Sequence, residues 1–397
     1  MLVLSRDLER IGGEAKIVAY HDGERVVDAF FVTTAPVRGF EKLVLGKSPL
    51  FVIEAVMRIC GICHAAHAIA AVEAFEDALG IAPPANGRIL REAIGLINRV
   101  QSHILHLMLM LPDLVPREHL KKAVIDVVGL LNRVNDVMMR IGGAPTHPPN
   151  IAIGGVAREI PESSLNEALR TLQEVYKVWK GVREFVESMQ CESPRAELLR
   201  KIEAPSVEFI ASHLFYGDRY NIRVDAVKVV RYEEYRKSFT ERVPENHIST
   251  TSLVALYNDR VVEAGPRARL RTYREFGDNT LMGIQLARMS EVDLALFRIS
   301  ELLEQVTPSG PVRTMSVTFR RGRGVGVYEA PRGTLIHRVE LDDEGRVKEY
   351  KIIVPTMFNI PVIERTLKGV PVEIADVVPR IYDPCIPCST HLVRVRD

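Results

Sequence analysis

The stretch "MRICGICHAAHAIAAVEAFEDALG", residues 57–80, places Cys60 and Cys63 three positions apart at the start of an alanine-rich run. Such a run favours a helix, and the "GIAPP" that follows is a typical helix stop. Residues three and four apart share one face of a helix. The spacing therefore predicts that Cys60, Cys63 and His67 line one side of a helix that begins near residue 60 and runs to about residue 79.

A second pair with the same spacing, Cys385 and Cys388, lies in "DPCIPCSTH", where a proline before each cysteine stiffens the backbone. Thiolates suit soft metals, so two such pairs can converge on one centre. A structural zinc site also uses two pairs, but these usually lie roughly 15–20 residues apart, whereas residues 64–384 separate the two pairs here. A thioredoxin-like motif needs a βαβ pattern, which surrounds neither pair. The pairs predict a four-thiolate site of undecided metal, with inert buried cysteines as the alternative and Cys191 as a bystander.

Hydrophobic periodicity changes twice along the chain. Residues 15–34 alternate apolar and polar side chains, which predicts a β-hairpin that turns at Asp22-Gly23. From about residue 51 to 305, including 271–289, apolar residues recur at helical spacing. Alternation then returns, and we expect strands at 312–319, 334–341 and 346–354, a flexible turn at "GRGVGV" (322–327), a turn at "DDEG" and an irregular segment after Pro355.

These patterns predict a predominantly helical α+β fold, in which a large helical bundle is flanked by small β elements from the N- and C-terminal regions. Apolar residues make up 47% and charged residues 26% of the chain, which is typical of a globular protein.

Charge and hydropathy exclude several classes of function. The net charge of +1 gives no electrostatic reason to expect nucleic acid or an anionic membrane as a partner. The most apolar region, residues 103–115, is too short to cross a bilayer, and the first residues lack the pattern of a signal peptide. We therefore expect a cytoplasmic chain that does not itself span a membrane.

The segments "RICGICHAAH" and "DPCIPCSTH" resemble the paired signatures of the large, catalytic subunit of nickel–iron hydrogenases. Interior segments resemble motifs of that family in the right order, namely "VRGFEKLVLGK" (37–47), "QSHILHLMLMLPDL" (101–114), "GGAPTHPPNIAIGGV" (142–156), "EAPRGTLIH" (329–337) and "VPTMFNIP" (354–361). The resemblance touches most of the chain. The short length of this chain is similar to that of the compact cytoplasmic, archaeal-type enzymes that reduce coenzyme F420.

The resemblance implies reversible heterolytic oxidation of hydrogen at a nickel–iron centre whose iron carries carbon monoxide and cyanide. Cys60 and Cys385 would be terminal nickel ligands, whereas Cys63 and Cys388 would bridge to iron. Cys385 would also accept the first proton. The matching motifs further imply Arg332 beside the open metal position, Pro331, Pro355 and Thr356 beside the ligands of iron, His67 as a donor to a bridging sulfur, and Asp113 and His103 in a polar canopy.

A second metal site, for magnesium or iron, is also implied. Glu41 and His391 match its side-chain ligands, and a main-chain carbonyl near Ile352 would complete it. The six residues after His391 resemble an extension that a nickel-dependent protease removes from such precursors. The expected domains are an N-terminal β region with a metal-ligand loop (1–50), a helical bundle with the first cysteine pair (51–310), a β-rich region with the second pair (311–391) and a removable extension (392–397).

One departure from the family pattern concerns proton transfer. The family places a glutamate in an Arg-(Ile/Val)-Glu-Gly motif, whereas this chain reads "RIGGEAKI", with Gly12 at that position. Either Glu14 or Glu9 replaces that glutamate, or the proton path runs elsewhere, or turnover is impaired. The alternative function is therefore a hydrogenase-like structural or coupling subunit, and a zinc-stabilised binding protein is a third hypothesis.

The partners follow from what the chain lacks. Nothing in it resembles an iron–sulfur cluster motif once the four cysteines are assigned, and "GRGVGV" does not have the spacing of a dinucleotide fingerprint. Electrons must nevertheless leave the site. The resemblance therefore implies a small subunit that carries the iron–sulfur clusters, a further electron-transfer subunit, maturation factors and the C-terminal protease. The final acceptor, whether a deazaflavin, a nicotinamide or a ferredoxin, stays open.

Overall fold

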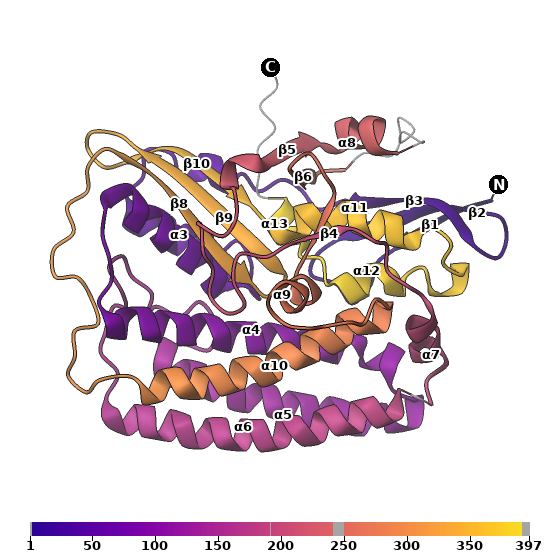
Figure 1. The fold of residues 1–397 in the computed structure, drawn as a ribbon, viewed down its shortest axis with the longest axis horizontal. Helices are drawn as coiled ribbons and strands as arrows, with labels where there is room; N and C mark the ends of the chain where they lie inside the picture. Colours follow the sequence, from indigo (N-terminus) through magenta and orange to yellow (C-terminus); the bar gives the residue numbers. More distant parts are fainter. Residues whose placement is uncertain (1, 191, 241–249, 391–397) are drawn as a thin grey trace.

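The computed structural model describes residues 2–190, 192–240 and 250–390. Long helices cross the lower part of the molecule, while the strands and most of the remaining helices lie above them (Figure 1). Helix α4 (Ala85–Leu114) is buried along most of its length between α10 (Leu281–Glu304) and α5 (Arg117–Gly142), and α6 (Glu162–Met189) packs on α5. The predicted predominantly helical α+β fold is confirmed.

Two antiparallel three-stranded sheets flank this bundle. The first joins β1 (Leu2–Asp7), β2 (Ala15–His21) and β3 (Val26–Thr33), which confirms the predicted hairpin. The second has the order β10 (Val347–Ile353), β9 (Gly333–Leu341), β8 (Gly322–Ala330). The shorter elements are α1 (Phe40–Leu43), α2 (Pro49–Met57), α3 (His64–Leu79), α7 (Pro194–Lys201), α8 (Tyr232–Phe239), α9 (Pro266–Tyr273), α11 (Pro355–Leu367), α12 (Val377–Tyr382) and α13 (Ile386–Ser389).

The predicted helical spacing between residues 51 and 305 is wrong in two places. Among the described residues, four short strands interrupt the helical region. β4 (Glu208–Ile210) and β7 (Val262–Ala264) form a parallel pair, and β5 (Val227–Arg231) and β6 (Leu253–Tyr257) form an antiparallel pair. Residues 274–280 are also not helical, because α10 begins only after Thr280, whose hydroxyl accepts the N–H of Gly283 as an N-cap.

Two predictions for the C-terminal third are also wrong. Residues 312–319 form a loop instead of a strand, with an isolated bridge between Arg313 and Gly155. The segment after residue 354 is helical instead of irregular. Pro355 stands at the first position of α11, where a missing N–H breaks no helical hydrogen bond.

The glycines of "GRGVGV" serve close packing, so the prediction of a flexible turn there is wrong. Gly322, Gly324 and Gly326 lie on β8, and a Cβ atom at any of them would come within 2.0–2.1 Å of a carbonyl oxygen of α3. Alternate residues of a strand face the same side, so the three glycines form one smooth stripe. The stripe lets the backbone of β8 lie directly against residues 70–78 of α3.

Within the described residues, no helix combines the length and the apolar character needed to cross a bilayer.

Candidate metal centre

The first cysteine pair lies at the start of α3 and not along its side. The helix begins at His64, with Cys63 at its N-cap and Cys60 in the turn before it. The backbone N–H groups of Ile62 and Cys63 both donate to Cys60 Sγ, at 3.3 Å. The predicted helix start near residue 60 is therefore wrong, because the backbone turns around this sulfur and donates to it before the helix begins.

The second pair lies on α13, with Cys385 at its N-cap. The N–H of Cys385 donates to Thr356 Oγ1 at 3.0 Å, and the N–H of Ile386 donates to the carbonyl oxygen of Gly12 at 2.7 Å. The start of α11 and the N-terminal loop thus hold this second cysteine loop from two sides.

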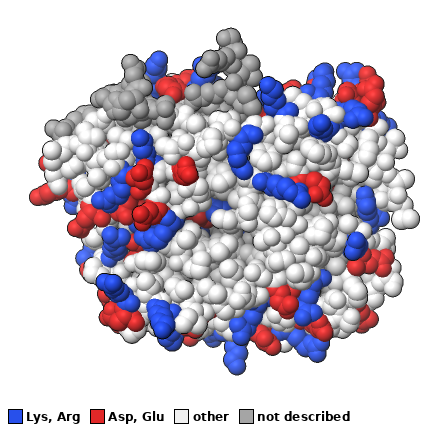
Figure 2. Space-filling model, turned by 180° about the vertical axis from the view of Figure 1, so that it is seen from behind, with Lys and Arg blue, Asp and Glu red and all other residues white. Residues whose placement is uncertain are grey.

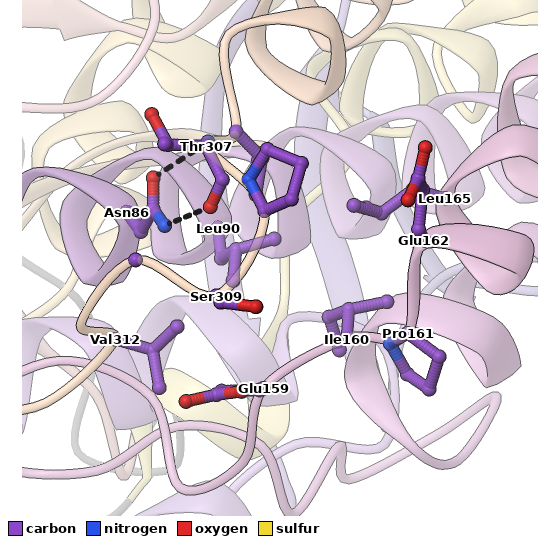
Figure 3. A pocket seen from close by; sticks show the side chains of 13 residues that line it. Asn86, Leu90, Glu159, Ile160, Pro161, Glu162, Leu165, Thr307, Ser309 and Val312 are labelled. Carbon is purple, nitrogen blue, oxygen red and sulfur yellow. Dashed lines mark hydrogen bonds between the residues drawn. The ribbon is translucent and has the colours of Figure 1, made fainter.

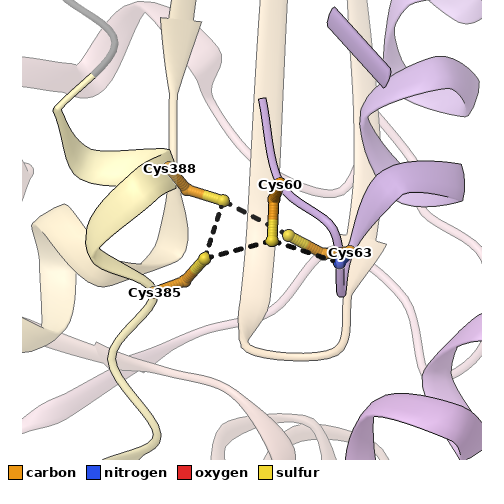
Figure 4. A group of neighbouring side chains, drawn as sticks. All are labelled: Cys60, Cys63, Cys385 and Cys388. Carbon is orange, nitrogen blue, oxygen red and sulfur yellow. Dashed lines mark hydrogen bonds between the residues drawn. The ribbon is translucent and has the colours of Figure 1, made fainter. Parts of the chain in front are cut away.

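The four sulfurs meet in one buried cluster although the pairs come from opposite ends of the chain (Figure 4). Cys60 and Cys385 approach to 3.3 Å between their Sγ atoms, and Cys63 and Cys388 to 3.2 Å. All four Sγ atoms lie within 4.8 Å of one another. None of these four thiols forms a disulfide, since the distances exceed the about 2.05 Å of an S–S bond. The convergence predicted from the spacing is confirmed, and it forms the donor set of a soft-metal centre.

Protonation of the cluster also favours a metal. Hydrogen bonds from Cys385 and the other two thiols lower the pKa of Cys60. Burial raises the pKa of Cys388, and its hydrogen bonds with the neighbouring thiols add to that shift. One thiolate is therefore favoured, while further ionisation requires positive charge among the sulfurs. A bound metal ion supplies that charge and deprotonates its thiol ligands.

Arg332, between β8 and β9, is a buried cation beside the cluster. Its Nε donates to the carbonyl oxygen of Asp383 at 2.7 Å, and its Nη2 donates to Asp383 Oδ1 at 2.8 Å. Burial opposes the charge, but Asp383 and three of the cysteines together raise the pKa of Arg332. Its Nη1 is buried and has no hydrogen-bond partner among the described residues. An unused donor at this place fits a metal centre that carries a further ligand able to accept a hydrogen bond.

His67 lies one helical turn after Cys63 and contacts the second cysteine pair. Its Nε2 lies 3.4 Å from Cys388 Sγ, and its Nδ1 lies 3.2 Å from His337 Nε2. His337 Nδ1 in turn lies 2.8 Å from Tyr350 Oη. The structure thus places His67 against one of the sulfurs, and it adds two residues to which the sequence analysis assigned no role.

The residues expected at the second metal site partly converge. The N–H of Ile352 on β10 donates to Glu41 Oε1 at 2.7 Å, and burial raises the pKa of Glu41 to about 7. His391 lies outside the described residues, as does the predicted extension 392–397. The carbonyl oxygen of Thr390, however, accepts the N–H of Arg38 at 2.9 Å. The described chain therefore ends next to the loop that leads to Glu41.

The other predicted residues take different positions. Pro355 and Thr356 begin α11, and Thr356 is the partner of the Cys385 N–H. Pro331 precedes Arg332, and its carbonyl oxygen accepts from Arg269. His103 and Asp113, which were expected in the polar canopy, have charged partners within the protein. His103 lies 2.9 Å from Glu291, and Asp113 pairs with Arg10, Arg195 and Arg380.

The N-terminal loop brings Gly12, and not a carboxylate, to the cluster. Glu9 and Glu14 are both exposed to solvent. A Cβ atom at Gly12 would lie 3.5 Å from the carbonyl oxygen of Pro384 and 3.7 Å from Cys385 Cα, which are ordinary contacts. The position can therefore hold a side chain beside Cys385.

Three residues of the hydrogen-bond networks around the cluster were missed by sequence reasoning. Asp383 has a left-handed backbone (φ 55°) and holds Arg332, and its place two residues before Cys385 was the available signal. His337 ends the quoted segment "EAPRGTLIH". Tyr350 lies in a strand of ordinary alternation, where the sequence carries no signal for a role at a metal centre.

A cavity of about 220 Å³ between the start of α4, the start of α6 and residues 306–312 is lined mainly by apolar and small side chains (Figure 3). On the face shown in Figure 2, basic and acidic side chains are interspersed, so no large surface of one sign is present there. The cysteine cluster is therefore the candidate functional site.

A buried four-thiolate cluster beside a fixed arginine is the donor set of a protein that binds a soft metal ion. The nickel-dependent hydrogenase family matches the chain over residues 38–115 and 274–391. The alpha subunit of the coenzyme F420 hydrogenase of Methanocaldococcus jannaschii is 36% identical over 97% of this chain and 92% of that protein. The alpha subunit of sulfhydrogenase 1 of Pyrococcus furiosus is 29% identical over 96% of both. The chain belongs to the nickel-dependent hydrogenase family, as a large subunit.

The fold agrees with solved structures of this class. A Ni-Fe-Se hydrogenase from D. vulgaris Hildenborough superposes with a TM-score of 0.86 over 98% of this chain and 100% of that chain, at 22% identity. The predicted resemblance and the prediction of an oxidoreductase are thus confirmed. The zinc-stabilised binding protein and the coupling subunit without turnover are not favoured, since all four cysteines are present and converge. A small subunit is the expected partner of such a large subunit.

Proposed function

We propose that this chain is the catalytic subunit of a cytoplasmic nickel–iron hydrogenase that exchanges electrons with coenzyme F420 through its partner subunits. The observation that carries the proposal is the convergence of two cysteine pairs from opposite ends of the chain on one buried point. The choice of acceptor is supported by similarity to alpha subunits of coenzyme F420 hydrogenases from three methanogens, at 29–36% identity.

In this proposal Cys60 and Cys385 would hold nickel, and Cys63 and Cys388 would be shared between nickel and an iron that carries carbon monoxide and cyanide. When bound, the centre supplies the Lewis-acid and redox chemistry that splits hydrogen into two protons and two electrons. The unused Nη1 donor of Arg332 and the hydroxyl of Thr356 supply polar contacts beside it, while Pro331 and Pro355 supply apolar walls.

The protein groups have separate tasks in the reaction. The Cys385 sulfur takes up a proton, because a terminal thiolate is a base that the fold holds in place. Arg332 stays charged and orients the bound ligands, since a guanidinium does not give up its proton and Asp383 fixes its plane. His67, whose Nε2 lies 3.4 Å from Cys388 Sγ, serves as a hydrogen-bond donor to that sulfur in this proposal.

We also propose a second cation, magnesium or iron, bound by Glu41, His391 and the carbonyl oxygen of Ile352. The support is the contact between Glu41 and Ile352 and the burial of that carboxylate, which gains a charge partner when a cation binds. Iron–sulfur clusters belong to the small subunit, and a further subunit passes the electrons on. Maturation factors load the centre, and a protease removes residues 392–397.

The proposal is tested by an infrared spectrum of the complex purified without air from its own host. Carbon monoxide and cyanide stretches, together with about one nickel per chain, are the expected result. A processed chain that holds zinc and lacks these bands would contradict the proposal. If the bands are absent and residues 392–397 remain attached, the same measurement is repeated after coexpression with the maturation factors, where continued absence again contradicts it.

The space for a side chain at Gly12, beside Cys385, leads to a separate prediction about proton transfer. Substituting Gly12→Glu places a carboxyl group next to the proposed proton acceptor and is expected to raise the rate of hydrogen–deuterium exchange about tenfold or more, since a positioned acid–base group contributes about 10²–10⁴-fold. Exchange in deuterated water, without an electron acceptor, measures this step. Gly12→Gln is the matched control, because it has the same size but cannot carry the proton at neutral pH. Equal rates in both variants would show that the proton path runs elsewhere.

A further inference from the structure

Three buried side chains form a hydrogen-bonded chain that ends at the Cys388 sulfur. From this geometry we infer that His337 and Tyr350 are positioning residues, which fix the tautomer and orientation of His67 so that its Nε2–H donates to Cys388. The inference rests on the proposed function, in which Cys388 is a metal-bound thiolate.

The contacts are continuous and shielded from water. They run from Tyr350 Oη to His337 Nδ1 (2.8 Å), from His337 Nε2 to His67 Nδ1 (3.2 Å), and from His67 Nε2 to Cys388 Sγ (3.4 Å). The three side chains are at most 2% exposed. Water is therefore not available as a competing partner for these side chains.

The fold explains why these residues meet. His337 on β9 is opposite Ile352 on β10, so Tyr350, two residues earlier, is its diagonal neighbour on the same face of the sheet. The glycine stripe of β8 brings α3 against that sheet, with Gly326 packed on Ala70, one turn after His67. Backbone geometry and close packing thus bring all three side chains together.

When the sulfur is a thiolate, only one direction of hydrogen-bond donation satisfies all three contacts between Tyr350 and Cys388. A metal-bound thiolate accepts hydrogen bonds and cannot donate, so His67 must carry its proton on Nε2. For neutral rings, His67 Nδ1 is then an acceptor and His337 must carry its proton on Nε2. His337 Nδ1 is left as an acceptor, and the Tyr350 hydroxyl donates to it. The hydroxyl therefore selects the tautomer of His337 and, through it, that of His67.

The consequence for the centre is electronic. A hydrogen bond to a metal-bound sulfur withdraws electron density from it, and such bonds are among the factors that set the reduction potentials of metal–thiolate sites. If the tautomers are no longer fixed, the average hydrogen bond to Cys388 weakens. The sulfur and the metal then become richer in electrons, which lowers both the midpoint potential and the stretching frequency of a carbon monoxide bound to the same centre.

The experiment compares Tyr350→Phe with Tyr328→Phe in the complete complex, matured in its host. Both tyrosines are buried on the same sheet, but the Tyr328 hydroxyl has no hydrogen-bond partner among the described residues, so it controls for loss of a buried hydroxyl. Expected for Tyr350→Phe are a shift of the carbon monoxide band to lower wavenumber, a lower midpoint potential and an activity loss of about tenfold. Tyr328→Phe should leave both the band and the potential in place.

A second pair of variants keeps the test decisive if Tyr350→Phe matures poorly. His337→Gln can accept from Tyr350 with its amide oxygen and donate to His67 with its amide nitrogen, so it should keep the wild-type band position. His337→Leu can do neither and should shift the band. Unshifted bands in Tyr350→Phe or in His337→Leu would overturn the inference while leaving the proposed function intact. Absence of the bands from the matured wild-type complex would instead overturn the proposed function.

Discussion

Replacing Cys385 with alanine is expected to abolish hydrogen activation. The variant loses one of four converging sulfurs and the proposed proton acceptor together, and it leaves the other three thiols without a complete donor set. We expect nickel to be lost from the purified complex, and hydrogen–deuterium exchange to fall by about 10⁴-fold or more, the scale seen when a member of a catalytic constellation is removed. Metal analysis and exchange measured on the same sample check both parts.

Cys191→Ala is the matched control, since it makes the same chemical change outside the two motifs, at a position outside the described residues. It is expected to keep its nickel and its activity. A Cys385→Ala complex that still holds nickel and exchanges hydrogen at more than about one-tenth of the wild-type rate would contradict the assignment of Cys385, since that loss is far below the scale for such a residue.

Arg332→Lys is expected to lower activity strongly while the metal stays in place. The guanidinium donates two hydrogen bonds to Asp383 and still has Nη1 available beside the cluster. A lysine ammonium keeps the charge, but it cannot reproduce this planar arrangement of donors. Loss of a donor aimed at a reaction centre costs about 10²–10³-fold in rate, and we expect a fall of that size in exchange with unchanged nickel content.

Arg338→Lys provides the comparison for this change. Arg338 lies on β9 six residues after Arg332, is partly exposed, and donates to the carbonyl oxygen of Val224. We expect the activity of the Arg338→Lys complex to stay within about twofold of the wild type, because the ion pair of Arg338 with Asp225 is exposed and such pairs contribute little. If Arg332→Lys behaved in the same way, charge alone would explain the role of Arg332, and its donor geometry would not matter.

The sequence predicted most accurately what depends on repeated local patterns. The hairpin of β2 and β3 follows from alternation around a turn, and the long helices follow from apolar spacing. The two cysteine pairs were found because thiols are rare in the chain and their spacing repeats. Their convergence was predicted from metal chemistry and not from any property of the residues between them.

What the sequence did not predict depends on contacts between distant segments. The glycines of β8 have the composition of a turn, and only the alanine-rich face of α3 makes them a packing stripe. The turn before α3 folds around the Cys60 sulfur, a local hydrogen-bonding effect that helix propensity does not describe. Tyr350 could not be singled out, because its role depends on a diagonal contact across two strands.

The distance along the chain between the two cysteine pairs constrains how the protein is made. Cys63 and Cys388 are 325 residues apart. At about 5–20 residues per second, the ribosome needs roughly 16–65 s to add the second after the first. During that interval two thiols await partners that do not yet exist, and an accessible thiol is open to oxidation. In each newly made molecule, the first cysteine pair can therefore be oxidised before the second pair joins it. Anaerobic synthesis or an early chaperone would protect these thiols until the cluster forms.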